Sequence, residues 1–321
     1  MRFELRQRLA YKQPVPDECR EPINAATRFC AVFGHPIRHS ASPAMHNAAL
    51  AALGLNWRYL AFDVHPDHLR GAIRGARLMG FIGLNLTVPH KLLALEMVDE
   101  VDEDAKSWGA VNTIVFECRD AAGQWVPVGR SEPAPGGEVR SRGFNTDADA
   151  LVQSLREAFE IETLRGVSVL LLGAGGAART AALRLAQEGV GALFLVNRTP
   201  ARAAELAKAI GQHYPGVAVT EGYPGQAVDL VINATSLGLK PGDPLPIDLP
   251  WLQSHRPKFV YDMIYRPMET GLLRAAKEAG CRPANGAGML LHQGARALEL
   301  WAGRPAPVQV MREALEENIY A

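Results

Sequence analysis

Short apolar runs alternate with amphipathic runs along most of the chain from Phe29 onward. The strand-like runs lie at residues 29–34, 55–64, 81–88 and 110–118, and the runs with helical spacing lie at 43–54, 66–80 and 90–109. Strands that alternate with helices in this way predict an α/β fold with a mainly parallel sheet.

A second strand–turn–helix series begins at Val167, after an amphipathic run at 148–160 that predicts a helix. Residues 119–142 lie between the two series and are rich in glycine and proline, which predicts an elongated surface loop or a hairpin insertion. Two further helices are expected after the last strand, at about 288–302 and 308–318.

Length and charge narrow the class of protein. At 321 residues the chain is about twice the length that serves as a soft prior for one domain, so we expect two domains. Lysine plus arginine equal aspartate plus glutamate at 34 each, so no positive field attracts nucleic acid or an anionic membrane surface. No run reaches the roughly 20 apolar residues of a membrane span, and the first 28 residues are too charged for a signal peptide.

The four cysteines, Cys19, Cys30, Cys118 and Cys281, are far apart and form no C-x-x-C pair. Their spacing predicts neither a zinc site nor a redox centre. We therefore expect a reducing compartment, the cytoplasm.

A glycine-rich turn follows the first strand of the second series. The motif is Gly173-x-Gly175-Gly176-x-Ala178, with an apolar strand before it and a helix after it. Gly173 permits a tight turn, Gly175 lets the backbone approach a pyrophosphate, and the helix N-terminus attracts its charge. The turn therefore predicts a dinucleotide site, although a plain strand-to-helix turn remains the alternative.

The next strand ends at Asn197, 24 residues after Gly173, where a site for NAD would carry an acidic residue. Arg198 and Arg202 follow instead, and guanidinium groups can donate several hydrogen bonds to a 2′-phosphate. NADP is thus favoured over NAD. The alternative is that both arginines belong to a solvated helix start.

Three polar clusters in the first half have no evident structural need: HSASP at 39–43, NLTVPHK at 85–91 and GAVNT at 109–113. Together with NTD at 145–147 and with GAGGAAR, NRTPAR, NATSLG, YDMIY and GMLLHQ further along, they resemble the shikimate dehydrogenase family. The resemblance runs from about Phe29 to Leu315. So many motifs in the same order are far more specific than any one of them.

The resemblance implies an activity and a domain organisation. The activity is the reversible, NADPH-dependent reduction of 3-dehydroshikimate to shikimate, a step of chorismate and aromatic amino-acid biosynthesis. Residues 29–146 and 288–321 would form the substrate-binding domain, residues 147–287 a Rossmann-type NADP-binding domain, and residues 1–28 an N-terminal extension. A quinate or dual quinate/shikimate dehydrogenase is the nearest alternative, and a non-catalytic NADP(H)-binding protein is one from another class.

Ser40 and Ser42 stand just before a helix whose first residue is expected to be Pro43. Two hydroxyls at a positive helix end suit a carboxylate, and both positions bind the substrate carboxylate in the family. The alternative is that Ser42 only caps the helix.

Lys91 is expected at the start of a helix, where a positive charge opposes the helix dipole. Such a lysine is easier to understand if it has a carboxylate or a substrate as its partner. The resemblance makes Lys91 the catalytic acid/base and Asp147 its partner. Taken singly, Asp147 is also read as a helix N-cap and Asn112 as a turn residue.

The resemblance also implies the remaining site residues. Around the substrate it places Asn85, Thr87, Asn112, Gln293 and Tyr265, the last of which is alternatively an amphipathic aromatic at a strand end. Around NADP(H) it places Gly173, Ala174, Gly175, Gly176, Ala177, Asn197, Arg198, Thr199, Arg202, Asn233, Thr235, Met263 and Gly286.

Five histidines fall near these motifs: His35, His39, His46, His90 and His292. Their spacing matches no metal-ligand pattern, and hydride transfer to a ketone needs only a proton donor and an aligned nicotinamide. We therefore expect no metal. We expect a small-molecule substrate as the main partner and a monomer or homodimer as the assembly.

Overall fold

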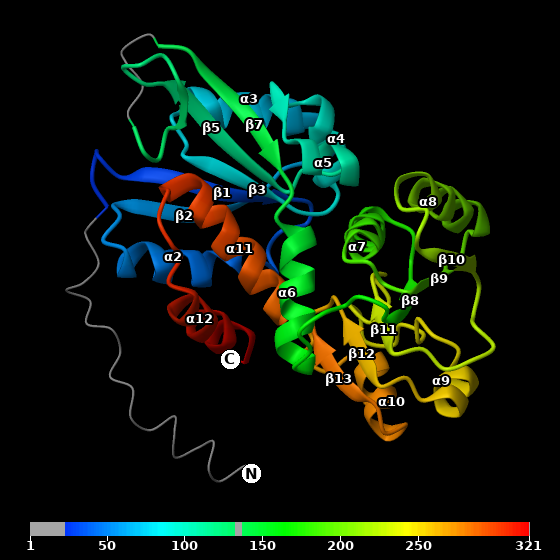
Figure 1. Ribbon diagram of the computed structural model, residues 1–321. Coiled ribbons are helices and arrows are strands. Elements are labelled where there is room, and N and C mark those ends of the chain that lie inside the picture. Colours follow the sequence, from blue (N-terminus) through cyan, green and yellow to red (C-terminus); the bar gives the residue numbers. More distant parts are fainter. Residues whose placement is uncertain (1–22, 132–136, 321) are drawn as a thin grey trace.

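Two β-sheets, one in each half of the chain, organise the fold (Figure 1). The computed structural model describes residues 23–131 and 137–320. Outside this range lie most of the predicted N-terminal extension, including Cys19, and residues 132–136 of the predicted insertion.

The first sheet has seven strands in the order β2-β1-β3-β5-β7-β4, with β6 paired to β5. The strands are β1 (Arg28–Gly34), β2 (Trp57–Asp63), β3 (Gly83–Leu86), β4 (Glu100–Val101), β5 (Thr113–Arg119), β6 (Trp125–Pro127) and β7 (Val139–Phe144). β1 runs parallel to β2 and β3, and β4 runs parallel to β7, whereas β5 runs antiparallel to β3, β6 and β7.

The expectation of a mainly parallel sheet is therefore confirmed, because six of the seven strands run in the same direction and only β5 is reversed. β5 and β6 are joined by a short connection, which allows only antiparallel pairing of the two strands. The same β5–β6 hairpin occupies the first part of the predicted insertion, in agreement with one of its two expected forms.

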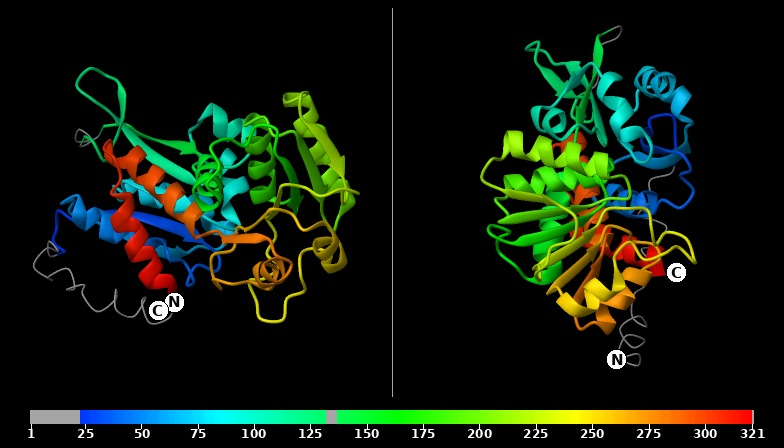
Figure 2. Two further views of the ribbon diagram at one scale, coloured as in Figure 1. Left: turned by 60° about the horizontal axis from the view of Figure 1, so that its bottom comes forward. Right: turned by 90° about the vertical axis from the view of Figure 1, so that its right-hand side faces the viewer.

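The second sheet is parallel throughout, in the order β10-β9-β8-β11-β12-β13, and its strands lie side by side in the right-hand view of Figure 2. The strands are β8 (Ser168–Leu172), β9 (Ala192–Val196), β10 (Ala218–Glu221), β11 (Leu230–Asn233), β12 (Phe259–Asp262) and β13 (Arg282–Asn285). This is the strand order of a Rossmann fold. β8 is apolar at nearly every position because both faces of the sheet are covered: Leu171 faces one hydrophobic cluster and Leu170 the other.

Helices cover both sheets. Those of the first half are α2 (Ser42–Ala52), α3 (Leu69–Leu78), α4 (His90–Leu93) and α5 (Glu103–Trp108), with 3-10 turns η2 (Pro66–His68) and η3 (Ala94–Glu96). Those of the second half are α7 (Gly176–Gln187), α8 (Pro200–His213), α9 (Leu249–His255) and α10 (Gly271–Glu278). α6 (Asp147–Phe159), α11 (Ala287–Ala302) and α12 (Val308–Tyr320) complete the set.

α6 and α11 pack side by side between the two sheets (Figure 1). Their close approach depends on Gly288, because a Cβ atom there would collide with the Ser154 hydroxyl. α11 then continues into the core of the first sheet, where Leu298 and Trp301 are fully buried. The C-terminal end of the chain is thus built into the first half of the molecule.

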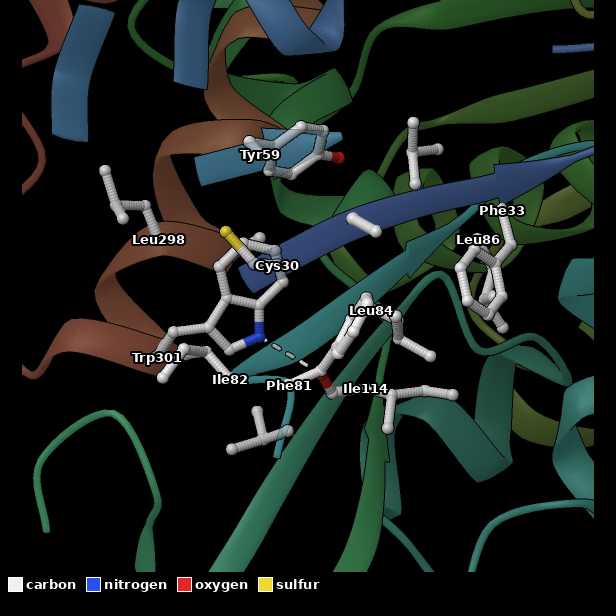
Figure 3. Packing of buried hydrophobic residues seen from close by; sticks show 14 of the residues in the cluster. Cys30, Phe33, Tyr59, Phe81, Ile82, Leu84, Leu86, Ile114, Leu298 and Trp301 are labelled. Atoms are coloured by element: carbon white, nitrogen blue, oxygen red, sulfur yellow. Dashed lines mark hydrogen bonds between the residues drawn. The ribbon is translucent and has the colours of Figure 1, made fainter. Parts of the chain in front are cut away.

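Trp301 is one of the largest buried side chains and anchors α11 to the first sheet (Figure 3). Its indole Nε1 donates a hydrogen bond of 3.0 Å to the carbonyl oxygen of Ile114 on β5. The indole lies against Gly83 of β3, where a Cβ atom would collide with the indole nitrogen and lie 2.6 Å from the Ile114 oxygen. Gly83 is therefore required for this packing.

Replacing Gly83 with alanine should lower the free energy of unfolding by about 1–3 kcal/mol, the usual cost of overpacking a core. Gly71 is the matched control because it lies on α3 with open space around its Cα. Gly71→Ala should raise the free energy of unfolding by about 0.5–1 kcal/mol. Urea denaturation measures both changes, and equal effects of the two substitutions would contradict the packing argument.

Candidate active site

Lys91 and Asp147 form an ion pair, with 2.7 Å between Lys91 Nζ and Asp147 Oδ2. Lys91 lies on the one-turn helix α4, and Asp147 is the first residue of α6. Their side chains are 26% and 12% exposed, so the pair is shielded on most sides while the ammonium group stays accessible. The structure thus brings together the two residues expected to act as acid/base and partner.

Asn145 holds the start of α6. Its Oδ1 accepts hydrogen bonds from the backbone N–H groups of Asp147 and Ala148, at 3.0 and 3.2 Å. The N-cap residue is Thr146, so the interpretation of Asp147 as the cap is wrong. The Asp147 carboxylate is left to Lys91, at a helix end that favours negative charge.

Asn112 is 1% exposed and is no simple turn residue. Its Oδ1 accepts a hydrogen bond of 2.7 Å from the Thr146 N–H, and its Nδ2 donates one of 3.0 Å to Thr146 Oγ1. The carboxamide therefore fixes the backbone directly before Asp147.

Asn85 and Thr87 stand at the end of β3. Asn85 is buried, accepts a hydrogen bond of 2.8 Å from the Tyr59 hydroxyl, and donates one of 3.0 Å to Thr113 Oγ1. Its Nδ2 also donates to the Asn112 carbonyl at 3.4 Å, so both amide hydrogens are used within the protein. Thr87 is partly exposed and directs its methyl group toward Gly34, where a Cβ atom would lie 2.5 Å away.

Ser40 and Ser42 lie at the start of α2, which begins at Ser42 with Ala41 as its N-cap. Pro43 is thus the second residue of the helix, one position later than expected. No side chain caps α2, so the interpretation of Ser42 as a cap is wrong. The Ser42 N–H donates to Ser40 Oγ at 3.3 Å, which holds the two serines together.

Tyr265 and Gln293 come from the second half of the chain. Tyr265 follows β12 and packs against the core of the first half. Burial raises the pKa of Tyr265, and the backbone of Ala41, beside the two serines, opposes the rise. Gln293 lies on α11, is 8% exposed, and donates from Nε2 to the Leu290 carbonyl oxygen at 2.8 Å.

The glycine-rich turn has the geometry that its sequence predicts. Gly173 has a φ of +112°, and a Cβ atom there would lie 3.1 Å from the Thr235 methyl group and 3.2 Å from the Ala234 carbonyl oxygen. α7 starts at Gly176 with Gly175 as an N-cap that makes no side-chain hydrogen bond. The first N–H groups of α7 are therefore suited to bind a phosphate.

Several residues of this turn are exposed, and a glycine nearby allows two backbone segments to approach closely. Ala174, Gly175 and Ala177 are partly or fully exposed, and Gly286 lies so close to the Met263 carbonyl group that a Cβ atom would not fit. A Cβ atom on Gly176 would lie 3.4 Å from the side chain of Leu92, the residue after Lys91. The N-terminal end of α7 therefore lies beside α4.

Asn197, Arg198, Thr199 and Arg202 follow β9, and both arginines are exposed. Asn197 Nδ2 donates to the Thr199 carbonyl oxygen at 2.8 Å, which closes the turn before α8. Within the residues that the structure describes, neither guanidinium group has a carboxylate partner. Both remain accessible to an added phosphate.

Asn233 is fully buried, and its side chain is committed to the protein. Oδ1 accepts from the Thr235 N–H and hydroxyl at 3.0 and 2.7 Å, and Nδ2 donates to the Leu237 carbonyl oxygen and to Asp262 Oδ1 at 3.2 and 3.0 Å. Asn233 therefore shapes the loop after β11 through its hydrogen bonds.

Asp262 is a residue that the sequence reasoning missed. It is completely buried at the end of β12, where Thr270 Oγ1 and the Ile264 N–H donate to it at 2.7 and 3.1 Å. Burial raises the pKa of this carboxyl group to about 6, and the hydrogen bonds oppose the rise. An acidic residue inside an otherwise apolar strand was a usable signal, since buried carboxylates need partners.

Between residues 23 and 320, leaving out 132–136, no cluster of three or more His, Cys, Asp or Glu side chains is arranged to bind a metal ion. Over the same residues, no helix has the length and apolar character needed to cross a membrane.

Three family descriptions match the chain in succession. "Shikimate dehydrogenase substrate binding domain" covers residues 32–114, "Shikimate / quinate 5-dehydrogenase" covers 155–238, and "Shikimate 5'-dehydrogenase C-terminal domain" covers 286–316. A shikimate dehydrogenase (NADP(+)) of Moorella thermoacetica is 46% identical over 93% of this chain and 96% of its own length. The chain belongs to the shikimate dehydrogenase family.

Solved structures of this family match the whole fold. A shikimate dehydrogenase in complex with NADP+ is 36% identical, with a TM-score of 0.79 over 93% of this chain and 98% of that one. A quinate dehydrogenase from Corynebacterium glutamicum in complex with NAD is 31% identical, with a TM-score of 0.74 over 91% and 99%. The fold is therefore shared by relatives with different substrates and cofactors.

The raised pKa of Asp262 predicts a pH dependence of stability. The carboxyl group has a pKa near 3.8 in the unfolded chain and about 6 in the fold, so the folded state binds the proton more tightly. Its contribution is fully present below pH 3.8 and is lost as the pH rises through 6. The loss should be about 3 kcal/mol at most.

Asp262→Asn should remove this part of the pH dependence, so that variant and parent differ in slope between about pH 4 and 7. Asp104→Asn, at an exposed position of α5, is the control and should follow the parent. Urea denaturation at a series of pH values measures the slopes. Parallel curves for the parent and Asp262→Asn would show that this carboxyl group does not titrate in that range.

Proposed function

We propose that the chain is an NADP-dependent shikimate dehydrogenase that interconverts 3-dehydroshikimate and shikimate. The observation that carries the proposal is the partly accessible ion pair between Lys91 and Asp147, in a chain of this family. Similar proteins named shikimate dehydrogenase (NADP(+)) support both the reaction and the cofactor.

The proposed mechanism pairs a hydride with a proton. NADPH, held by the N-terminus of α7 and the turn after β9, would supply the hydride that reduces the C3 ketone of 3-dehydroshikimate. Lys91 donates a proton from Nζ to the developing alkoxide, which completes the hydroxyl group of shikimate. A lysine is ordinarily protonated at neutral pH, and the Asp147 carboxylate at 2.7 Å holds the ammonium group in position. In the reverse direction the neutral Lys91 amine would accept the proton of the shikimate hydroxyl group.

The proposed substrate contacts follow from the start of α2 and its surroundings. Ser40 and Ser42 would bind the carboxylate at a helix end that no side chain caps. Tyr265 would stand beside it, as its packing against the core of the first half supports. Thr87, Asn85, Asn112 and Gln293 would surround the ring hydroxyls.

The proposed cofactor contacts combine the α7 N-terminus with the turn after β9. Gly173 to Ala177 would hold the pyrophosphate, and Arg198 and Arg202, with Asn197 and Thr199, would hold the 2′-phosphate. Asn233, Thr235, Met263 and Gly286 would border the nicotinamide end.

Quinate is the second candidate substrate, because a quinate dehydrogenase is 31% identical to this chain over nearly its whole length.

The cellular location and the oligomeric state of the protein are also proposals. Buried free cysteines at Cys30, Cys118 and Cys281 support the cytoplasm, and we propose a monomer or a homodimer.

Cofactor and substrate are tested together by rates with shikimate and quinate, each with NADP and with NAD. We expect the highest kcat/KM for shikimate with NADP. Replacing both Arg198 and Arg202 with alanine should raise the KM for NADP by about tenfold or more while sparing NAD, since only NADP carries the 2′-phosphate. Arg165→Ala, an exposed arginine of the same half, is the control. Equal losses with both cofactors would overturn the assignment.

Lys91→Ala should lower kcat by about two to four orders of magnitude, the usual range for loss of a general acid. The KM for shikimate should change less, because proton transfer develops in the transition state. Asp147→Asn should be similarly impaired, and the double variant little worse than either single one. Steady-state kinetics at 340 nm measure these changes.

Lys106→Ala is the matched control for Lys91→Ala, because Lys106 also pairs with a carboxylate but is exposed on α5. It should keep parental kcat. A Lys91→Ala enzyme that retains more than about a tenth of parental kcat would contradict the mechanism, since loss of a general acid lowers kcat by far more than tenfold.

A further inference from the structure

Tyr59 is a fully buried tyrosine of β2 whose ring and backbone are both fixed. The ring stacks on His46 with 4.0 Å between centroids and 1° between planes, and Trp301 lies 6.3 Å away. Asn47 holds the backbone, since its Oδ1 accepts from the Tyr59 N–H and its Nδ2 donates to the Tyr59 carbonyl oxygen, both at 2.9 Å. With the ring fixed, the position of its hydroxyl group is fixed too.

The Tyr59 hydroxyl points away from Trp301 (Figure 3) and begins a chain of hydrogen bonds across the first sheet. It donates to Asn85 Oδ1 at 2.8 Å, and Asn85 Nδ2 donates to Thr113 Oγ1 at 3.0 Å. Thr113 Oγ1 donates to Asn112 Oδ1 at 3.2 Å, which also accepts from the Thr146 N–H at 2.7 Å. The chain ends one residue before Asp147.

We propose that Tyr59 is a positioning residue of the shikimate site, whose hydroxyl group orients the Asn85 carboxamide. This inference rests on the proposed function, because it acts through Asn85 as a residue beside the substrate hydroxyls. Tyr59 itself is fully buried and acts only through Asn85.

Removing the hydroxyl acts on Asn85. Asn85 Oδ1 loses its donor inside a buried environment, which leaves that oxygen unsatisfied. The carboxamide also loses the partner that selects its orientation. A substrate must then order Asn85 on binding, and part of the binding free energy is lost.

Tyr59→Phe keeps the stacked ring and should raise the KM for shikimate by about fivefold to tenfold, with the KM for NADP within about twofold of the parent. Tyr261→Phe is the matched control, because Tyr261 is equally buried and its hydroxyl shares a hydrogen bond of 2.8 Å with Ser154 in the second half. Tyr261→Phe should lower the melting temperature about as much as Tyr59→Phe does, but it should not change the KM for shikimate.

A double-mutant cycle with Asn85→Ala separates positioning from general loosening of the fold. If Tyr59 acts through Asn85, adding Tyr59→Phe to Asn85→Ala should raise the KM for shikimate by less than about twofold. Adding Tyr261→Phe to Asn85→Ala should change nothing further.

Three results would overturn the inference while leaving the proposed function intact: an unchanged KM for shikimate in Tyr59→Phe, fully additive effects in the cycle, or equal rises in KM for shikimate and NADP. If the parent protein does not oxidise shikimate at all, the proposed function and this inference both fail. The parent assay therefore tells the two failures apart.

Discussion

The ion pair between Lys91 and Asp147 is the interaction on which the rest of the site depends. The Asp147 side chain is 12% exposed, and removing a carboxylate from water costs free energy. The Lys91 ammonium group beside it offsets part of this desolvation free energy. The pair joins α4, which follows the end of β3, to α6, which leads into the second sheet. The positions of the two helices are therefore not independent, and the substrate contacts proposed around them are set by the same pair.

Buried carboxamides do most of the positioning around this pair. Asn145 holds the first turn of α6, Asn112 holds the residue before Asp147, and Asn85 links β3 to β2 and β5. Asn233 does the same for the loop after β11. Each carboxamide has two donors and one acceptor oxygen, so it can join three neighbouring segments at once. The consequence is a site whose backbone is held by side chains that are largely saturated within the protein.

Much of this architecture follows from local sequence patterns. The strand, turn and helix around Gly173 are determined by residues that are close together in the sequence, and the structure has them as expected. The same holds for the turn after β9 that carries the two arginines. The order of motifs identified the family, which the comparisons confirm. The roles assigned to individual site residues stay predictions.

What the sequence could not reveal depends on contacts between distant segments. Tyr59 looks like an ordinary strand aromatic until His46, Asn85 and Trp301 surround it. The antiparallel placement of β5 is set by its pairing with β3, β6 and β7, which no local pattern encodes. The shift of Pro43 to the second position of α2 is a boundary effect of one residue, within the usual uncertainty of helix ends.

The contact between Leu92 and Gly176 has a mechanical consequence. Leu92 and Lys91 are neighbours on a helix of one turn, so any rotation of one sheet against the other that separates Leu92 from α7 also carries the lysine with it. The proposed proton donor and the glycine-rich turn are thus mechanically coupled. By the reciprocity of linked equilibria, a ligand that bound at the turn and favoured this packing would also favour a ligand at Lys91, and by the same free energy in the other direction.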